Sequence, residues 1–325
     1  MVFERVLGQQ PAVAALMRAL RSGRVHQAYR FEGPPGVGKE LAAFAFAQSL
    51  LCDGGGPIGC GQCRACEQAV SLSAQPPVVP QHPDLLLLAR GLYPPALLGM
   101  SQPEAAGIGI EQVRRVVLAR VGYPPHEGRA VVCIIRDADE LTNQAANALL
   151  KTIEEPGEHM FFVLVTSRPD RLPDTVRSRT LAVRFGPLPE QVVSSILERN
   201  GVPTEAAAVA EGSASLALEL ADPEQMAVRQ DFADAVLRAV GASDLAAALD
   251  LVETRSLVRE RVREQLAFLA QTFAQRSRQA VRTQSGLSEL AARQHRVVLG
   301  AMRSLDRFGQ PALVLEAMVT RLRRA

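Results

Sequence analysis

The sequence of 325 residues contains no tryptophan, and only two of its 36 basic residues are lysines, Lys39 and Lys151. Because arginine supplies nearly every other positive charge, an arginine in this chain carries little information about function, whereas a lysine carries more. No apolar run approaches the ~20 residues that a membrane-spanning helix needs. Residues 1–10 lack the charged-then-apolar pattern of a secretory signal. These absences predict a cytoplasmic protein with no membrane partner.

Net charge is also nearly absent. The 36 basic and 34 acidic residues give a formal charge of +2, so the composition supplies no bulk electrostatic reason to bind nucleic acid or a membrane surface. Hydrophobic residues make up 47% of the chain, which is enough for a large core. At this length we expect two or three domains.

A phosphate-binding loop stands at residues 33–40, which read Gly-Pro-Pro-Gly-Val-Gly-Lys-Glu. Its glycines let backbone N–H groups approach phosphates, and Lys39 contacts the terminal phosphates. Glu40 replaces the serine or threonine whose hydroxyl holds Mg²⁺, and its charge weakens triphosphate binding unless a cation compensates it. The loop therefore leaves ATP binding open and disfavours hydrolysis. The glycines of this predicted nucleotide site are Gly33, Gly36 and Gly38.

Strand and helix patterns surround this loop. Residues 28–32 run into it as a strand would, and two later apolar runs have the character of buried strands. Between them lie segments with helical periodicity. Strands that alternate with helices predict an α/β fold with a mostly parallel sheet covered on both faces. The later strands are predicted at 130–135 and 161–166, and the helices at 11–22, 39–51, 110–121 and 144–155.

The remaining segments differ in character. Residues 53–109 are rich in glycine, proline, serine and glutamine around a short apolar run at 85–88, and we expect loop and insertion there. After residue 187 the pattern becomes helical, with almost no β-type sequence. We expect an α/β module over 1–187, a small helical unit over 188–224 and an all-helical domain over 225–325.

Four of the five cysteines lie within fifteen residues, in the pattern C-x7-C-x2-C-x2-C. Two consecutive C-x2-C steps let neighbouring thiolates converge on one tetrahedral cation, and disulfides are not expected in a reducing compartment. The spacing predicts a structural zinc ion bound by Cys52, Cys60, Cys63 and Cys66. Cys133, in a predicted buried strand, is expected to be plain core.

The strand at 130–135 ends in Arg136-Asp137-Ala138-Asp139-Glu140. In phosphate-loop ATPases an acid at such a strand end holds Mg²⁺. Two interpretations are open. Either Asp139 and Glu140 are the functional pair, two residues late, or Arg136 and Asp137 occupy the pair's position and the first acid is missing.

Further motifs carry a resemblance to a known family. Residues 144–156 read Gln-Ala-Ala-Asn-Ala-Leu-Leu-Lys-Thr-Ile-Glu-Glu-Pro, and Arg177-Ser178-Arg179 follows the next strand. These motifs resemble the clamp-loader branch of the AAA+ ATPases, and the cysteine module is similar to that of the bacterial DNA polymerase III clamp loader. The resemblance, which covers residues 1–220, implies an AAA+ module with a zinc insertion at 52–66, a helical lid, and a helical collar for oligomerisation.

Two kinds of clamp-loader subunit share this layout: the ATP-hydrolysing motor (gamma/tau) and the non-hydrolysing delta-prime. Counting back from the motif at 147–151 to the motor's acidic pair lands on Arg136 and Asp137, which implies that the first acid is missing. Ser215 stands where the motor carries its lid arginine. With Glu40, three groups of a hydrolysing site are absent, so the resemblance favours a delta-prime-like subunit without intrinsic ATPase activity.

The resemblance also implies roles for single residues. Ser178-Arg179-Thr180 matches the family's Ser-Arg-Cys motif, whose arginine reaches into a neighbouring subunit's ATP site as a finger acting in trans. Thr180 departs from the motif but leaves the arginine intact. Thr166 and Ser167 match a polar strand end that senses the γ-phosphate in active members.

Arg114 matches a helix that follows the DNA backbone in the assembled loader, and Arg115 and Arg120 are candidates for the same face. The few phosphate contacts of one subunit give little affinity alone. The resemblance therefore implies gamma/tau and delta subunits as partners, and contact with primer–template DNA and the sliding clamp through the assembled complex.

These observations support three hypotheses about function, of which the first is favoured. The first is a stator subunit of a heteropentameric sliding-clamp loader in DNA replication, which donates Arg179 to a neighbour's ATP site. The second is an ATP-hydrolysing clamp-loader motor that uses Asp137 or Asp139 in a rearranged metal site; the position of Arg136 opposes it. The third is a zinc-containing nucleic-acid-binding module with a vestigial ATPase fold, but residues 60–66 lack interleaved aromatic and basic residues.

Overall fold

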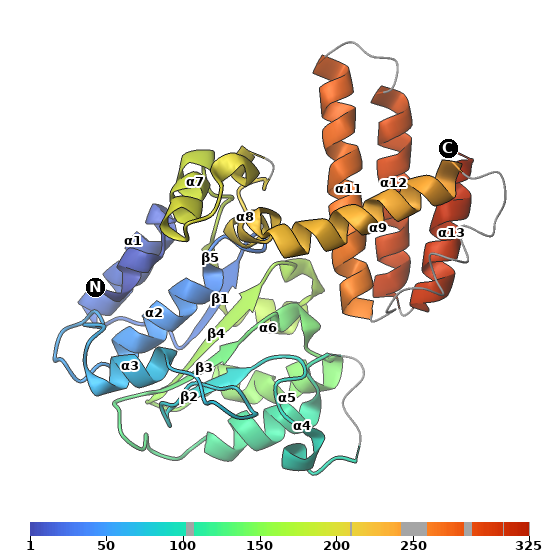
Figure 1. The fold of residues 1–325 in the computed structure, drawn as a ribbon. Helices are drawn as coiled ribbons and strands as arrows, with labels where there is room; N and C mark the ends of the chain where they lie inside the picture. Colours follow the sequence, from blue (N-terminus) through green and yellow to red (C-terminus); the bar gives the residue numbers. More distant parts are fainter. Residues whose placement is uncertain (102–106, 209, 242–258, 283–287, 308, 325) are drawn as a thin grey trace. The chain divides into compact units, whose positions relative to one another are not determined.

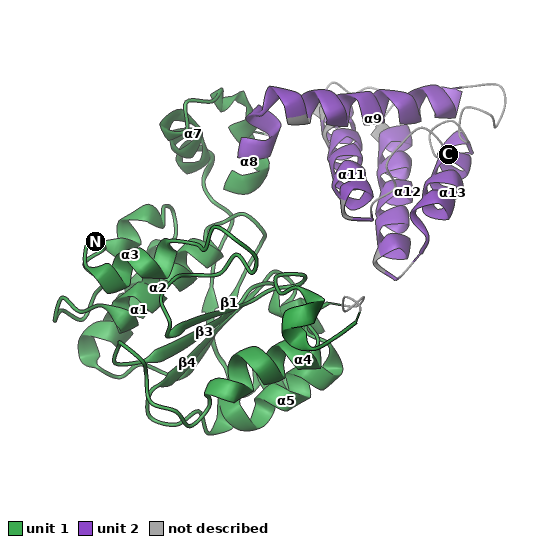
Figure 2. Cartoon of the chain, turned by 60° about the horizontal axis from the view of Figure 1, so that its bottom comes forward, with its two compact units in different colours: residues 1–217 green, residues 218–325 purple. Residues whose placement is uncertain are grey.

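The computed structural model describes residues 1–101, 107–208, 210–241, 259–282, 288–307 and 309–324. The chain divides into two compact units, residues 1–217 and 218–325 (Figure 2). The division falls within helix α8 (Ala214–Ala221). The boundaries expected for the lid (188–224) and the collar (225–325) stay predictions. Residues 242–258 and 283–287 of the expected collar lie outside the described residues.

The first unit is built on a five-stranded sheet in the order β2-β3-β4-β1-β5. Every strand pair is parallel, which confirms the predicted α/β fold. Strand β1 lies between β4 and β5, so the phosphate loop that follows it leaves the sheet one strand in from the edge. The strands are β1 (Ala28–Glu32), β2 (Leu85–Leu88), β3 (Val131–Ile135), β4 (Met160–Thr166) and β5 (Leu181–Arg184).

Helices cover both faces of this sheet (Figure 1). Alternate residues of a strand point to opposite faces, and the burial follows this rule. On one face Tyr29 and Phe31 of β1 meet Phe46 of α2 edge to face. On the other face Phe162 of β4 shares a core with Leu149 of α5. The helices of this unit are α1 (Gln10–Ser22), α2 (Lys39–Leu51), α3 (Arg64–Val70), α4 (Ile110–Gln112), α5 (Asn143–Glu154), α6 (Asp174–Arg177) and α7 (Glu190–Arg199).

Two segments differ from the sequence-based expectation. The apolar run 85–88, which lay inside the expected loop and insertion, forms edge strand β2 because its leucines pair with β3 and are largely buried. The helix expected at 110–121 is irregular: α4 passes into a π-helical turn at Val113–Val117 and a 3-10 turn at Leu118–Arg120. These turns keep both Val113 and Val117 in the core beneath the sheet.

The second unit is helical in its described part, as expected for the end of the chain. Its helices are α9 (Pro223–Gly241), α11 (Arg259–Arg282), α12 (Ser288–Asp306) and α13 (Pro311–Arg323). Large side chains from all four helices share one buried core, among them Phe232, Leu266, Phe273, Val298 and Met318. Among the helices that the structure describes, none has the length and apolar composition to cross a membrane.

The core of the second unit gives a test of stability. Phe273 is 1% exposed, so Phe273→Ala should lower the free energy of unfolding by about 3–5 kcal/mol, because it leaves a cavity in a packed core. Val281, on the same helix, is 65% exposed, and Val281→Ala should change stability by less than about 0.5 kcal/mol. Urea unfolding followed by circular dichroism compares the two. Equal losses would contradict the packing described here.

Candidate functional site

The phosphate loop joins β1 to α2 in the strand–loop–helix arrangement that its motif requires. Gly36 and Gly38 have φ angles of 71° and 95°, in the left-handed region that glycine adopts at little cost. A Cβ on Gly33 would lie 2.1 Å from the backbone oxygen of Phe185, so this position admits no side chain. The loop ends at the amino terminus of α2, where free N–H groups and the helix dipole favour an anion.

Lys39 is buried and turned back onto the loop that carries it. Its Nζ donates to the backbone oxygens of Gly33 (2.7 Å) and Pro34 (2.5 Å) and to Oγ of Ser167 (3.1 Å). An ammonium has three N–H donors, and all three are used by these contacts. Burial lowers the pKa of Lys39 to about 8, although nearby Asp137 and Asp139 act in the opposite direction. A phosphate group would have to replace these contacts.

Glu40 forms an ion pair with Arg136, the residue that follows β3. Both side chains are partly exposed. Nε of Arg136 is buried and has no hydrogen-bond partner within the described part of the chain. Arg136 is therefore the residue at this strand end that contacts Glu40. Glu40 stands where the motif has the metal-binding hydroxyl.

The acids that follow Arg136 have different surroundings. Asp139 accepts hydrogen bonds from Oγ1 of Thr166 (2.7 Å) and Nε of Arg168 (2.7 Å). Burial acts to raise the pKa of Asp139, but these hydrogen bonds and the charge of Arg168 hold it below its ordinary value. Asp137 has a left-handed φ of 47°. Burial and the adjacent Asp139 charge raise the pKa of Asp137.

Glu40 and Asp139 do not fit as ligands of the Mg²⁺ ion of a phosphate-loop ATPase. Magnesium needs hard oxygen ligands in near-octahedral geometry. Here the carboxylate of Glu40 is neutralised by the guanidinium of Arg136, and both oxygens of Asp139 are engaged by Thr166 and Arg168. A fixed guanidinium also repels a second cation at short range.

The start of α8 rests on the phosphate loop within the first unit. The backbone N–H of Ala214 donates to the backbone oxygen of Gly36 (2.8 Å). A Cβ on Gly36 would lie 2.2 Å from the hydroxyl oxygens of both Ser213 and Ser215. Ser215, which stands where the resemblance expects a lid arginine, thus supplies a small hydroxyl in close contact with the loop.

The four clustered cysteines converge as their spacing predicts. Their sulfur atoms all lie within 4.8 Å of one another, and Sγ of Cys52 lies 3.8 Å from Sγ of Cys63. Sulfurs at ~2.3 Å from a tetrahedral zinc are ~3.8 Å apart, so the set fits this ion. Backbone N–H groups of Gln62 and Cys63 donate to Sγ of Cys60 and lower its pKa to about 6. Cys133 lies apart in the core of β3.

Arg179 follows α6 and carries a partly exposed side chain. Its guanidinium forms an ion pair with Glu154 at the end of α5, and Nη1 donates to the backbone oxygen of Thr175 (2.9 Å). The next residue, Thr180, is buried and bonded to Arg30 of β1. Neither Glu154 nor Arg30 has a role that the sequence predicts, because both contacts join segments far apart in the chain.

The three arginines expected on one DNA-facing helix separate into two groups. Arg114 and Arg115 are exposed and lie near Glu111, with Nη1 of Arg114 donating to it at 2.8 Å. Arg120 points elsewhere, since its Nη2 donates to the buried carboxylate of Asp84 at 3.0 Å. The suggestion that Arg120 shares the face of Arg114 is therefore wrong.

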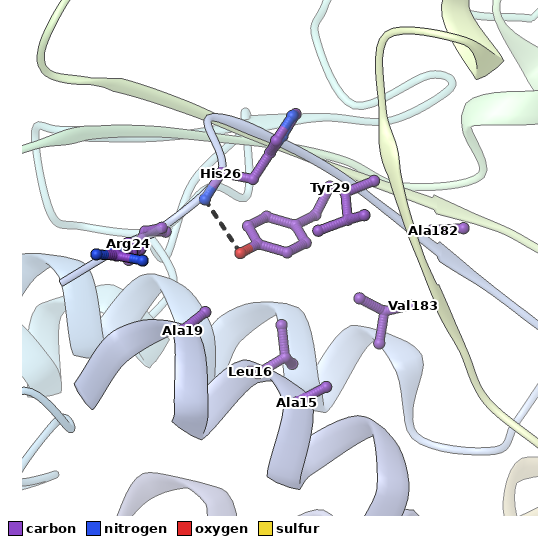
Figure 3. Close-up of a pocket in the computed structure, with 10 residues that line it drawn as sticks. Ala15, Leu16, Ala19, Arg24, His26, Tyr29, Ala182 and Val183 are labelled. Atoms are coloured by element: carbon purple, nitrogen blue, oxygen red, sulfur yellow. Dashed lines mark hydrogen bonds between the residues drawn. The ribbon is translucent and has the colours of Figure 1, made fainter. Parts of the chain in front are cut away.

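A cavity of about 610 Å³ lies between α1 and β5 (Figure 3). Apolar side chains such as Leu16 and Val183 line it, together with Tyr29, whose hydroxyl accepts from the backbone N–H of His26 (3.2 Å). Tyr29 lies near the start of β1, whereas the phosphate loop follows its end. This cavity is therefore separate from the predicted nucleotide site.

Residues 8–189, more than half of the chain, match the family described as "DNA polymerase III, delta subunit". The chain belongs to this family. The resemblance to clamp-loader subunits of DNA polymerase III is thereby confirmed.

Curated relatives include both kinds of subunit. The chain is 36% identical to DNA polymerase III subunit gamma/tau of Mycobacterium tuberculosis over 197 residues, which are 61% of this chain and 31% of that protein. It is 33% identical to subunit delta' of Bacillus subtilis over 198 residues, 60% of this chain and 53% of the relative. The matched part of the chain thus spans 31% and 53% of the lengths of these two relatives.

A solved structure of a DNA polymerase III gamma subunit-related protein from Thermotoga maritima covers 96% of this chain and 99% of its own, with 15% identity and a TM-score of 0.49. A TM-score this low supports no conclusion about function.

The cysteine cluster gives a test by elemental analysis. We expect about one zinc per chain in protein purified without chelator, because four thiolates close a tetrahedral site. Cys60→Ser should reduce the zinc content strongly and lower the unfolding temperature, since metal binding contributes to folding. Cys133→Ala is the matched control: it removes a cysteine outside the cluster and should keep the metal. Wild-type protein without zinc would refute the prediction.

Proposed function

We propose that this chain is a delta-prime-like stator subunit of a sliding-clamp loader in DNA replication. In this proposal it assembles with gamma/tau and delta subunits, does not hydrolyse ATP itself, and donates Arg179 to the ATP site of a neighbouring subunit. Membership of the DNA polymerase III family supports the general role. The specific role rests on the phosphate loop and on Arg179.

The observation that carries the proposal is the ion pair between Glu40 and Arg136. A hydrolysing site uses an oxygen ligand at each of these two positions to hold Mg²⁺ over the phosphates. Here the guanidinium of Arg136 cannot bind a metal ion, and it neutralises the carboxylate of Glu40. Neither residue therefore supplies the ligand. The contacts of Asp139 with Thr166 and Arg168 also argue against a motor that uses Asp139 as the replacement acid.

Arg179 supplies what such a subunit can still contribute. A guanidinium that enters a neighbour's site neutralises charge that develops on the γ-phosphate, and it needs no nucleotide on its own chain. The side chain is 38% exposed and lies on the loop after α6, so it is accessible to a partner. In this proposal the zinc module at 52–66 is structural, and primer–template DNA and the clamp are contacted through the assembled complex, with Arg114 as a candidate phosphate contact.

The first test concerns the chain alone. Because Glu40 and Arg136 replace the metal ligands, purified protein should show no ATP turnover above background in a coupled assay with Mg²⁺. Lys39→Ala is the control for contaminating activity, since it removes the ammonium of the phosphate loop. Turnover in the wild type that Lys39→Ala abolishes would establish a working site and refute the stator proposal.

The second test concerns Arg179 in the complex reconstituted with gamma/tau and delta subunits. Fingers acting in trans contribute roughly 10³–10⁵ in rate, or about 4–7 kcal/mol of barrier. A loader with other intact fingers dilutes this effect, so Arg179→Ala should cause a partial loss of DNA-stimulated ATPase and a larger loss of clamp loading. Assembly, measured by native mass, should be unchanged.

The matched control is Arg21→Ala, which removes another exposed arginine, on α1. It should leave both activities at the wild-type level. Equal activities for the Arg179→Ala and Arg21→Ala complexes would make Arg179 an ordinary surface arginine. A chain that formed no complex with the other subunits would refute the proposal as a whole.

A further inference from the structure

Arg30 is a buried cation that the proposed function does not use. It lies on β1, directly before the phosphate loop, and only 9% of its surface is exposed. Burying a guanidinium is costly unless its charge and its N–H donors are satisfied. Nε of Arg30 donates to Glu32 (3.0 Å), which is also largely buried. This ion pair fixes the plane of the guanidinium on the strand.

The other end of the guanidinium reaches the segment that carries the finger. Nη1 of Arg30 donates to the backbone oxygen of Arg177 (2.9 Å) and to Oγ1 of Thr180 (2.7 Å). Arg177 and Thr180 flank Ser178-Arg179 on either side. The turn at residues 177–180, which carries Arg179, is therefore hydrogen-bonded at both ends to the buried guanidinium of Arg30.

The hydroxyl of Thr180 both accepts and donates a hydrogen bond. It accepts from Arg30 and donates to the backbone oxygen of Val176 (3.0 Å). A cysteine, which the family motif has at this position, is a weak donor and a weak acceptor. Threonine at 180 is therefore suited to a buried arginine partner.

On the outer side, the guanidinium of Arg179 contacts Glu154 and the backbone oxygen of Thr175. Glu154 is 43% exposed and the pair is open to solvent, so this contact orients the finger weakly. The buried contacts of Arg30 hold the backbone of the turn at residues 177–180. The exposed contacts of Arg179 allow its guanidinium to move away from Glu154.

We propose that Arg30 and Thr180 are positioning residues for the Arg179 finger: they fix the turn at residues 177–180 so that the guanidinium is presented to a neighbour's ATP. The inference rests on the proposed role of Arg179 in trans. It assigns a function to Thr180, the residue that departs from the family motif, and to an arginine 150 positions earlier in the chain.

The test uses the full reconstituted complex and two substitutions at one position. Thr180→Val keeps the shape and removes the hydroxyl, whereas Thr180→Ser keeps the hydroxyl. Misplacing a catalytic group by about 1 Å costs as much as about 10²-fold in rate. The part of the DNA-stimulated ATPase that depends on Arg179 is the part that Arg179→Ala removes. We expect Thr180→Val to lower this part about 3–10-fold and Thr180→Ser to retain it.

A purely structural role is distinguished by combining substitutions. If Thr180 acts through Arg179, Thr180→Val should have no further effect on the ATPase of a complex that already carries Arg179→Ala, because the two changes remove the same contribution. An equal loss in both backgrounds would show a general folding defect and overturn the inference. Native mass and zinc content of each variant complex establish that it is assembled and folded.

The outcomes separate the inference from the function on which it rests. If Arg179→Ala lowers activity but Thr180→Val does not, the positioning role fails and the finger stands. If Arg179→Ala itself has no effect, both fail. Loss in Thr180→Val, recovery in Thr180→Ser and no added loss in the Arg179→Ala background together support the inference.

Discussion

At the carboxyl end of β3 the chain carries the guanidinium of Arg136, at the position where the family resemblance implies a metal-binding acid. Arg136 forms an ion pair with Glu40 and neutralises the charge of its carboxylate. Asp139, three residues beyond Arg136, accepts hydrogen bonds from Arg168 and Thr166. Lys39 donates to backbone oxygens of its own loop.

The consequence is a phosphate loop whose charged groups find their partners within the protein. Lys39 and the side chain of Asp139 are buried, and a buried charge is costly unless it is paired or hydrogen-bonded. Loss of either Glu40 or Arg136 would leave the other residue without its ion-pair partner. The two replacements are thus interdependent, although they lie 96 positions apart in the sequence.

Local features could be predicted from the sequence and long-range contacts could not. The phosphate loop, the main strands and the converging cysteines follow from spacing and periodicity, which act over a few residues. Strand β5 escaped prediction because its four residues are mostly exposed and carry no alternation. Arg120 was misplaced because only the fold brings Asp84 beneath it. Thr180 departs from the family motif, and only the fold brings Arg30 within hydrogen-bond distance of its hydroxyl.

Gly36 shows that a glycine of a phosphate-binding motif can also be required by packing. Its missing side chain makes room for Ser213 and Ser215, and its backbone oxygen accepts from Ala214. A substitution there would push the start of α8 off the loop whether or not any phosphate ever binds. In this chain the glycine is therefore required by packing of the phosphate loop against the start of α8. In a mutational scan, loss of function on substitution of Gly36 would therefore report a packing defect and not necessarily a loss of nucleotide chemistry.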